Sequence, residues 1–253
     1  MNITLHTFLI VCPLVFLASF VDSIAGGGGL ISLPAYLLAG LPPHYAIATN
    51  KFSSSVGTFI ATVRYCKNKL VDWKTAIPSI LLSLIGSTLG ANLSLLVDEK
   101  ILKIILIIIL PMVALYVLFG KNFTKKAAKK TLSRKKVYLI ACTASFFIGA
   151  YDGFYGPGTG TFLILVYTGL ARMDIGTASG NTKLVNLASN LAALTTFWIS
   201  GKIIFILGIV AALFSIAGSY VGSGLVLKNG YKIVKPVIII VISLLFLKVI
   251  SGS

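Results

Sequence analysis

Charged side chains are scarce in this sequence, and acidic ones are the scarcest. Its 253 residues include 22 Lys and Arg but only 6 Asp and Glu, so that 11% of the residues are charged and 57% are hydrophobic. Soluble globular domains average about a quarter charged residues. Because so few charges cannot cover a soluble domain of this length, lipid must replace much of the polar surface. The composition therefore predicts an all-α polytopic membrane protein.

Cysteine and histidine are also scarce. Cys12, Cys66 and Cys142 lie far apart among apolar residues, which excludes a disulfide framework and a cysteine metal cluster. His6 and His44 have no metal-ligand spacing, and no nucleophile has a matching histidine and carboxylate. The glycine-rich segments lack the Gly-Lys-Ser/Thr of a nucleotide-binding loop. We therefore expect no enzyme activity, no metal and no cofactor.

The basic residues are concentrated in one run. The formal net charge is +16, and eight of the basic residues lie close together: Lys121, Lys125, Lys126, Lys129, Lys130, Arg134, Lys135 and Lys136. Basic loops beside membrane-spanning helices stay in the cytoplasm and face anionic lipid. We therefore expect a cytoplasmic linker at residues 121–137, which explains the charge without a nucleic-acid partner.

Apolar segments occupy most of the remaining sequence. The first begins at Phe8 and is a membrane segment rather than a signal peptide, because residues 1–7 carry no Lys or Arg and no clear cleavage site follows. The other nine are residues 29–41, 45–65, 74–97, 101–119, 138–151, 159–171, 175–200, 203–227 and 235–250. The ten segments form two sets of five.

The two sets are copies of each other. A shift of 132 residues places Lys51 on Lys183, and a shift of 130 residues places Asp22 on Asp152. We therefore expect two membrane repeats, residues 1–120 and residues 138–253.

An odd number of segments makes the second repeat enter the membrane from the side opposite to the first. Such inverted repeats are typical of secondary transporters. With the linker inside the cell, the basic loop at residues 64–74 and the basic residues near 172 and 228–235 also fall inside. The loops at residues 42–45 and 98–100 and both termini fall outside. This distribution follows the preference of basic loops for the cytoplasm.

Two of the segments are too short to cross the membrane as straight helices, which need about 20 residues. Residues 29–41 follow the glycines Gly26–Gly29, and residues 159–171 follow the break Gly156–Gly160. Broken or re-entrant helices at matching positions line the substrate site of many transporters. The exposed N–H groups at the start of each short helix would attract an anion. Alternatively, the glycines serve only close helix packing.

Four ionisable residues lie within the apolar segments. Asp22 and Asp152 are the acids at this depth, and Lys51 and Lys183 are the matching bases. Each buried charge costs about 2.5–3.5 kcal/mol on insertion scales, so each needs a partner or a function. Two interpretations remain open. The residues form structural ion pairs, or the lysines attract an anion while the aspartates couple transport to protons.

Amide and hydroxyl side chains surround the two lysines. Asn186 and Asn190 are four residues apart and share a helix face, where they bind an oxyanion or bond to another helix. The predicted substrate site combines the two breaks with these polar residues: Gly26, Gly27, Gly28, Gly29, Asn50, Lys51, Gly156, Gly158, Thr159, Gly160, Thr161, Asn181, Lys183, Asn186 and Asn190.

Four motifs occur in order along the chain: D-x3-G-G-G-G-L-I-S-L-P at Asp22–Pro34, A-T-N-K at Ala48–Lys51, D-x3-G-P-G-T-G at Asp152–Gly160 and N-T-K-L-x-N-x3-N at Asn181–Asn190. As a set, they resemble the sulfite exporter TauE/SafE family over essentially the whole chain. The resemblance implies export of small sulfur oxyanions or organosulfonates, such as sulfite or sulfoacetate, by alternating access. It also implies the plasma membrane of a bacterium or archaeon.

Other functions remain open from the sequence. The alternatives are an anion channel, a transporter of a non-sulfur organic anion, and a membrane assembly factor. The two Gly-x3-Gly seams, Gly86–Gly90 and Gly218–Gly222, could pack helices within one chain or join two copies in a homodimer.

Overall fold

The structure is a computed structural model that describes residues 3–102, 104–105, 108, 132–229, 231–233 and 236. In these ranges every regular element is helical, which agrees with the predicted all-α class. The predicted segments 101–119 and 235–250 and most of the linker 121–137 lie outside the described residues.

The helices follow the predicted segments closely. They are α1 (Leu5–Ala25), α2 (Gly29–Leu38), α3 (Pro43–Lys67), α4 (Trp73–Leu96), α6 (Arg134–Phe154), α7 (Thr159–Gly169), α8 (Ile175–Ile199), α9 (Phe205–Asn229) and the 3-10 turn η2 (Tyr231–Ile233). The largest difference is at α6, which begins at Arg134. Lys135 and Lys136, which the sequence places in the linker, therefore lie in the first turn of α6.

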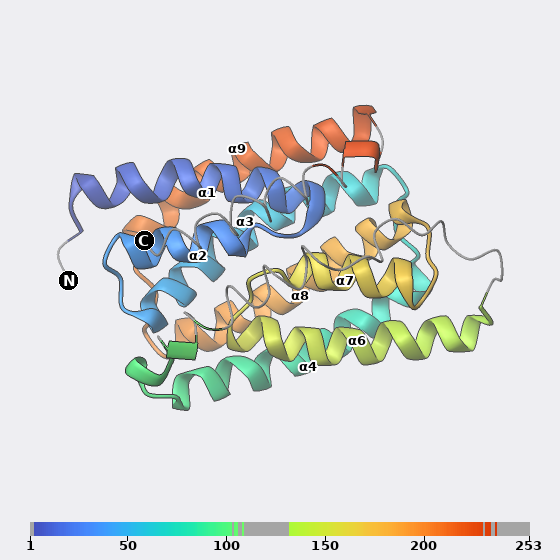
Figure 1. Cartoon of the computed structure of the whole chain (residues 1–253), viewed down its shortest axis with the longest axis horizontal. Coiled ribbons are helices and arrows are strands. Elements are labelled where there is room, and N and C mark those ends of the chain that lie inside the picture. Colours follow the sequence, from blue (N-terminus) through green and yellow to red (C-terminus); the bar gives the residue numbers. More distant parts are fainter. Residues whose placement is uncertain are drawn as a thin grey trace.

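Helices α1, α4, α6 and α9 form the outer layers of the bundle, and each is long and apolar enough to cross a membrane (Figure 1). A helix rises about 1.5 Å per residue, so 21 to 24 residues match a hydrocarbon core of about 30 Å. Their outward faces carry exposed large apolar side chains, such as Leu89, Phe147 and Leu213. An apolar surface of this kind, on helices long enough to span a membrane, is typical of contact with lipid.

Helices α3 and α8 lie between the two outer layers (Figure 1). Helix α3 packs on α9 and α8, and α8 packs on α4 and α3. Both have 25 residues, and their buried faces carry Ser, Thr, Asn and Lys. Protein rather than lipid surrounds these polar groups, so the bundle can hold them at membrane depth.

Glycines on α4 and α9 join the two halves. A Cβ atom added to Gly90 would lie 1.9 Å from the carbonyl oxygen of Ala150 on α6, and one added to Gly218 would lie 2.2 Å from that of Phe16 on α1. No side chain fits at these distances. The Gly-x3-Gly seams therefore pack helices within one chain, α4 against α6 and α9 against α1.

The two ends of the bundle differ in charge. At one end, Arg134 at the start of α6 pairs with Asp72 before α4 (Nη2–Oδ1, 3.6 Å), and the Tyr138 hydroxyl donates to the Lys74 carbonyl oxygen. These contacts bring the basic residue 64–74 loop beside the start of α6, as the loop charges predicted. At the opposite end, the His44 Nδ1 lies 3.4 Å from Glu99 Oε1.

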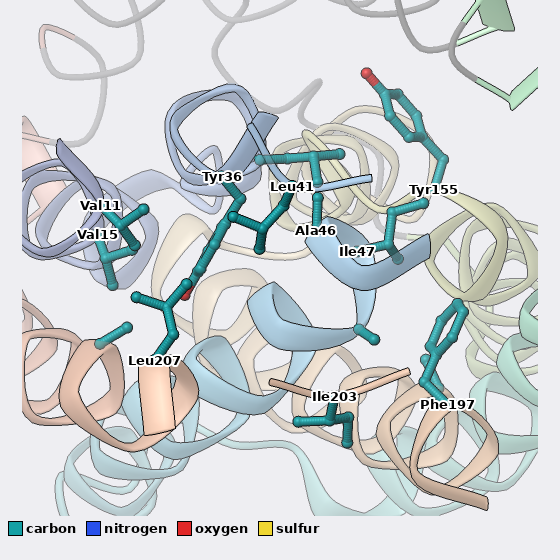
Figure 2. Close-up of a cluster of buried hydrophobic side chains, with 14 of the residues drawn as sticks. Val11, Val15, Tyr36, Leu41, Ala46, Ile47, Tyr155, Phe197, Ile203 and Leu207 are labelled. Carbon is teal, nitrogen blue, oxygen red and sulfur yellow. The ribbon is translucent and has the colours of Figure 1, made fainter. Parts of the chain in front are cut away.

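A cluster of buried apolar side chains fills the bundle near the α2–α3 and α8–α9 connections (Figure 2). Both halves contribute to it, with Val15 and Tyr36 from the first half and Phe197 and Leu207 from the second. Val15 also borders the polar cavity described below. The cluster therefore adjoins that cavity at Val15.

Candidate functional site

The two glycine-rich breaks meet inside the bundle. Helix α1 ends before Gly26, whose φ of 79° is left-handed, and α6 is joined to α7 through Gly156 and Gly158, with φ of 99° and 85°. Glycine adopts these angles without the strain that a Cβ would cause. The Thr161 N–H donates to the Gly26 carbonyl oxygen at 3.2 Å, so one break is bonded directly to the other.

The backbones approach too closely at the crossing for any side chain. A Cβ atom on Gly26 would lie 2.4 Å from the carbonyl carbon of Gly160, and one on Gly160 would lie 2.6 Å from the Gly26 Cα. A Cβ on Gly28 would lie 2.5 Å from the Ala18 carbonyl oxygen. These glycines therefore serve close packing, and the crossing that they permit places the starts of α2 and α7 next to each other.

A polar cavity of about 40 Å³ lies at this crossing. It has room for about three water molecules. Most of the predicted site residues line it: Asp22, Gly26, Gly28, Gly29, Asn50, Lys51, Asp152, Gly156, Thr159, Gly160, Asn186 and Asn190. The structure thus brings together residues from α1, α2, α3, α6, α7 and α8.

Lys51 and Asp152 form an ion pair at the cavity wall. The Lys51 Nζ lies 2.7 Å from Asp152 Oδ2 and donates to Asn190 Oδ1 at 2.9 Å. The Lys51 side chain is 3% exposed and that of Asp152 is 2% exposed. The other carboxylate oxygen of Asp152 accepts a hydrogen bond from the Thr159 hydroxyl at 2.8 Å.

Lys183 and Asp22 form the second pair. The Lys183 Nζ lies 3.1 Å from Asp22 Oδ2 and also donates to the Asp22 backbone carbonyl oxygen. Each pair joins a lysine of one half to an aspartate of the other. The structure thus contains both Asp–Lys contacts that the sequence suggested, and in each the partners come from different halves.

Both aspartates also stand at the starts of the short helices. The Gly28 N–H donates to Asp22 Oδ1 at 3.3 Å before α2, and Thr159, the first residue of α7, bonds to Asp152. A carboxylate at a helix N-terminus is stabilised by the free N–H groups and the helix dipole. The helix ends predicted to attract an anion are therefore already close to the chain's own carboxylates.

Five of the predicted site residues do not line the cavity: Gly27, Gly158, Thr161, Asn181 and Lys183. Asn181 Oδ1 accepts from the Asp72 backbone N–H at 2.9 Å, and so fixes the loop before α4. The Thr161 hydroxyl donates to the Ala25 carbonyl oxygen at 3.0 Å and ties α7 to the end of α1.

Several cavity residues were missed in the sequence: Val15, Ala18, Ser19, Ser32, Ser53, Ser54, Thr58 and Ser219. The repeat could have identified two of them. Subtracting the shift of 132 from Asn186 and Asn190 gives Ser54 and Thr58, which line the same cavity from α3. The other serines have no comparable signal, because small hydroxyl residues are common where membrane helices pack.

One buried polar atom in the cavity wall lacks a partner. Asn50 is 8% exposed, and its Oδ1 has no hydrogen bond within the described part of the chain. A buried amide oxygen left without a donor is unfavourable by about 1–3 kcal/mol. A ligand or an ordered water in the cavity would satisfy it.

Known proteins resemble this chain over nearly its full length. A probable membrane transporter protein ORF9 from Sinorhizobium sp is 36% identical over 95% of this chain and 91% of its own. The probable membrane transporter protein YfcA from Escherichia coli K12 is 34% identical over 99% of this chain and 95% of its own. A probable membrane transporter protein from Haemophilus influenzae is 33% identical over 95% of this chain and 93% of its own. No solved structure shows a significant match.

The family comparison covers nearly the whole helical bundle. The sequence model described as sulfite exporter TauE/SafE matches residues 11–249, which includes both glycine-rich breaks, both lysines and both aspartates. Together with the apolar spanning helices, this match shows a membrane transporter. The chain belongs to the sulfite exporter TauE/SafE family.

Proposed function

We propose that this protein is a secondary transporter that exports small sulfur-containing anions, such as sulfite or an organosulfonate, across a prokaryotic plasma membrane. The observation that carries the proposal is the polar cavity at the crossing of the two breaks. It lies inside an apolar bundle and contains a lysine, two aspartates and several amide and hydroxyl side chains. Irregular backbone at membrane depth is tolerated where it lines such a cavity.

The chemistry of the cavity wall supports an anion as substrate. Lys51 supplies an ammonium group, and Asn186, Asn190, Ser54 and Thr58 can supply neutral hydrogen-bond donors. The starts of α2 and α7 add the positive ends of two helix dipoles. The unpaired Asn50 oxygen adds an acceptor, which suits a water molecule or a protonated oxyanion.

The size of the cavity supports a compact substrate. Space for about three water molecules accommodates a small oxyanion better than an extended sulfonate. The choice of a sulfur-containing anion rests on the family, whose description names sulfite.

Alternating access is supported by the arrangement of the helices. The matching helices α1 and α6 run in opposite directions along the bundle (Figure 1), as expected of an inverted repeat. In the proposed mechanism the halves at residues 1–120 and 138–253 move against each other around the cavity, joined by the cytoplasmic linker at residues 121–137. Asp22 and Asp152 are the candidate proton-coupling groups.

A thermal-stability experiment tests the anion site. Detergent-purified protein is heated with sulfite, thiosulfate, sulfoacetate, taurine, sulfate, phosphate or chloride. A ligand at 100 times its dissociation constant stabilises the folded state by about 2.7 kcal/mol. We expect a selective increase in the unfolding temperature with sulfite or another small sulfur anion. No shift with any anion, in a sample that unfolds cooperatively, would contradict the proposal.

Transport assays in proteoliposomes separate a carrier from a channel. A carrier exchanges labelled anion inside for unlabelled anion outside, because each turnover moves a bound molecule. We expect such counterflow for the anion that stabilises the protein. Fast, non-saturating flux without counterflow would favour an anion channel instead.

A further inference from the structure

The two buried ion pairs are equivalent in the sequence but different in the structure. Lys51 lines the cavity, whereas Lys183 does not and is completely buried. The hydrogen-bond and ion-pair contacts of the Lys51 ammonium group are the side chains of Asp152 and Asn190. Lys183 instead donates to the backbone carbonyl oxygen of Asp22 as well as to its carboxylate.

The backbone contact fixes the Lys183 pair. The Asp22 carbonyl lies in the last turn of α1 and also accepts from the Gly26 N–H at 2.8 Å. A lysine bonded to the last carbonyls of a helix stabilises that helix end. Removing Lys183 from Asp22 would therefore disturb the end of α1 and the break that follows it. Lys51 can change partners by side-chain rotation alone.

An anion in the cavity would compete with Asp152 for Lys51. If the anion takes the ammonium group, Asp152 retains the Thr159 hydroxyl on one oxygen and loses its cation. A carboxylate that is only 2% exposed is strongly disfavoured without a cation. It then becomes neutral by binding a proton. The new O–H is a donor that can bond to the anion itself.

Charge balance leads to the same result. Within the described part of the chain, the charged residues of the cavity wall are Lys51, Asp22 and Asp152, and Lys183 adjoins them through Asp22. The other groups beside Asp152 are the uncharged Thr159 on α7 and Tyr151 on α6, whose hydroxyl donates to a backbone carbonyl. Two lysines and two aspartates sum to zero, so a bound monoanion leaves one negative charge unless one proton enters with it.

We propose that the anion displaces Asp152 from Lys51, and that Asp152 takes up one proton from water for each monovalent anion bound. This inference rests on the transport function proposed above. The Lys183–Asp22 pair stays closed during this exchange and holds the break after α1. The Lys51–Asp152 pair is thus the exchanging pair, and anion and proton enter the cavity together.

Titration calorimetry on the full-length protein in detergent tests this stoichiometry. The probe is methanesulfonate, a monoanion that does not titrate near neutral pH. Comparing binding enthalpies in two buffers with different protonation enthalpies gives the number of protons taken up. We expect one proton per anion in the wild type and none in Asp152→Asn. Asp174→Asn, at the start of α8 and away from the cavity, is the matched control and should also take up one proton.

The pH dependence of anion binding to the wild type also tests the inference. This measurement does not require any variant to fold. One linked proton makes the dissociation constant rise about tenfold per pH unit where free Asp152 is ionised. Binding without proton uptake and without this pH dependence would overturn the inference and leave the transporter proposal standing. Proton uptake that persists in Asp152→Asn would show that another group binds the proton and would overturn the assignment to Asp152. If neither methanesulfonate nor any anion of the panel binds the folded protein, the transporter proposal itself fails.

Discussion

The crossing of the two breaks can be tested with alanine at a single glycine. Gly26 and Gly40 both have left-handed φ angles, of 79° and 85°. An alanine Cβ at residue 26 would lie 2.4 Å from the carbonyl carbon of Gly160, whereas at residue 40 nothing lies within 4 Å. The pair therefore separates the cost of the backbone angle from the cost of the contact between the breaks.

The magnitudes follow from these two terms. A left-handed conformation costs a non-glycine residue about 1–2 kcal/mol, so Gly40→Ala should be destabilised by about that amount. Gly26→Ala adds overpacking against backbone, which costs about 1–3 kcal/mol more. In a chain of this size, 1 kcal/mol lowers the unfolding temperature by about 2–4 °C. We therefore expect Gly26→Ala to unfold at least about 2 °C below Gly40→Ala.

Gly27→Ala completes the series. Its added Cβ would meet only the Thr161 hydroxyl, at an ordinary 3.4 Å. The three variants, purified in the same detergent, are compared by thermal unfolding, and we expect Gly27→Ala to be the least affected. Equal unfolding temperatures for Gly26→Ala and Gly40→Ala would show that the breaks do not touch at Gly26 and would refute the geometry of the site.

Three further substitutions test individual side chains. Lys51→Ala should weaken anion binding by at least about tenfold, because it removes the ammonium group of the cavity. Its control is Lys202→Ala, which removes a cation beside the Tyr45 ring and should leave anion binding unchanged. Equal dissociation constants for the two variants, measured by calorimetry, would contradict the assignment of Lys51 to the site. Thr58→Val should reduce anion affinity by about 0.5–1.5 kcal/mol of binding free energy, because the cavity loses a hydroxyl group. Thr88→Val, on the exposed face of α4, is its control. An unchanged anion affinity in Thr58→Val would show that Thr58 does not bind the anion. Asn181→Ala should destabilise the fold by about 1–3 kcal/mol, because the Asp72 N–H loses its acceptor. Asn92→Ala, at an exposed position, is its control and should change stability much less. Equal unfolding temperatures for the two variants would argue against the contact between α8 and the loop before α4.

The fold could be predicted from the sequence to the level of its helices. Apolar length identified α1, α4 and α9, because a spanning helix must have about 20 mostly apolar residues. The predicted apolar segment of α6, residues 138–151, is shorter than the helix itself, Arg134–Phe154. The glycine-rich breaks identified the short helices α2 and α7, since glycine is the residue that allows the chain to turn sharply there. The start of α6 lies four residues before the predicted segment, because basic residues such as Lys135 are compatible with both a loop and a first helical turn.

The site was predicted in part. The errors in the predicted set of residues have a geometric cause. Asn186 and Asn190 lie four residues apart on one helix face, and both line the cavity. Asn181 lies five residues before Asn186 and so points to a different face, where it bonds to the loop before α4. The pairing of each lysine with the aspartate of the other half could not be predicted, because it depends on how the halves pack together.

The contacts of α4 and α9 have a consequence for synthesis of the protein. Helix α4 leaves the ribosome well before α6, yet the glycine surface of α4 is shaped for α6, and α1 likewise precedes α9, whose glycines pack against it. The first half must therefore wait in the membrane with polar groups such as Lys51 unpaired until α6 and α8 are inserted. Insertion of α6 supplies Asp152 and the missing face at the same time. Assembly is thus a late event, and a chain truncated after the first half should be recognised by the cell as incomplete.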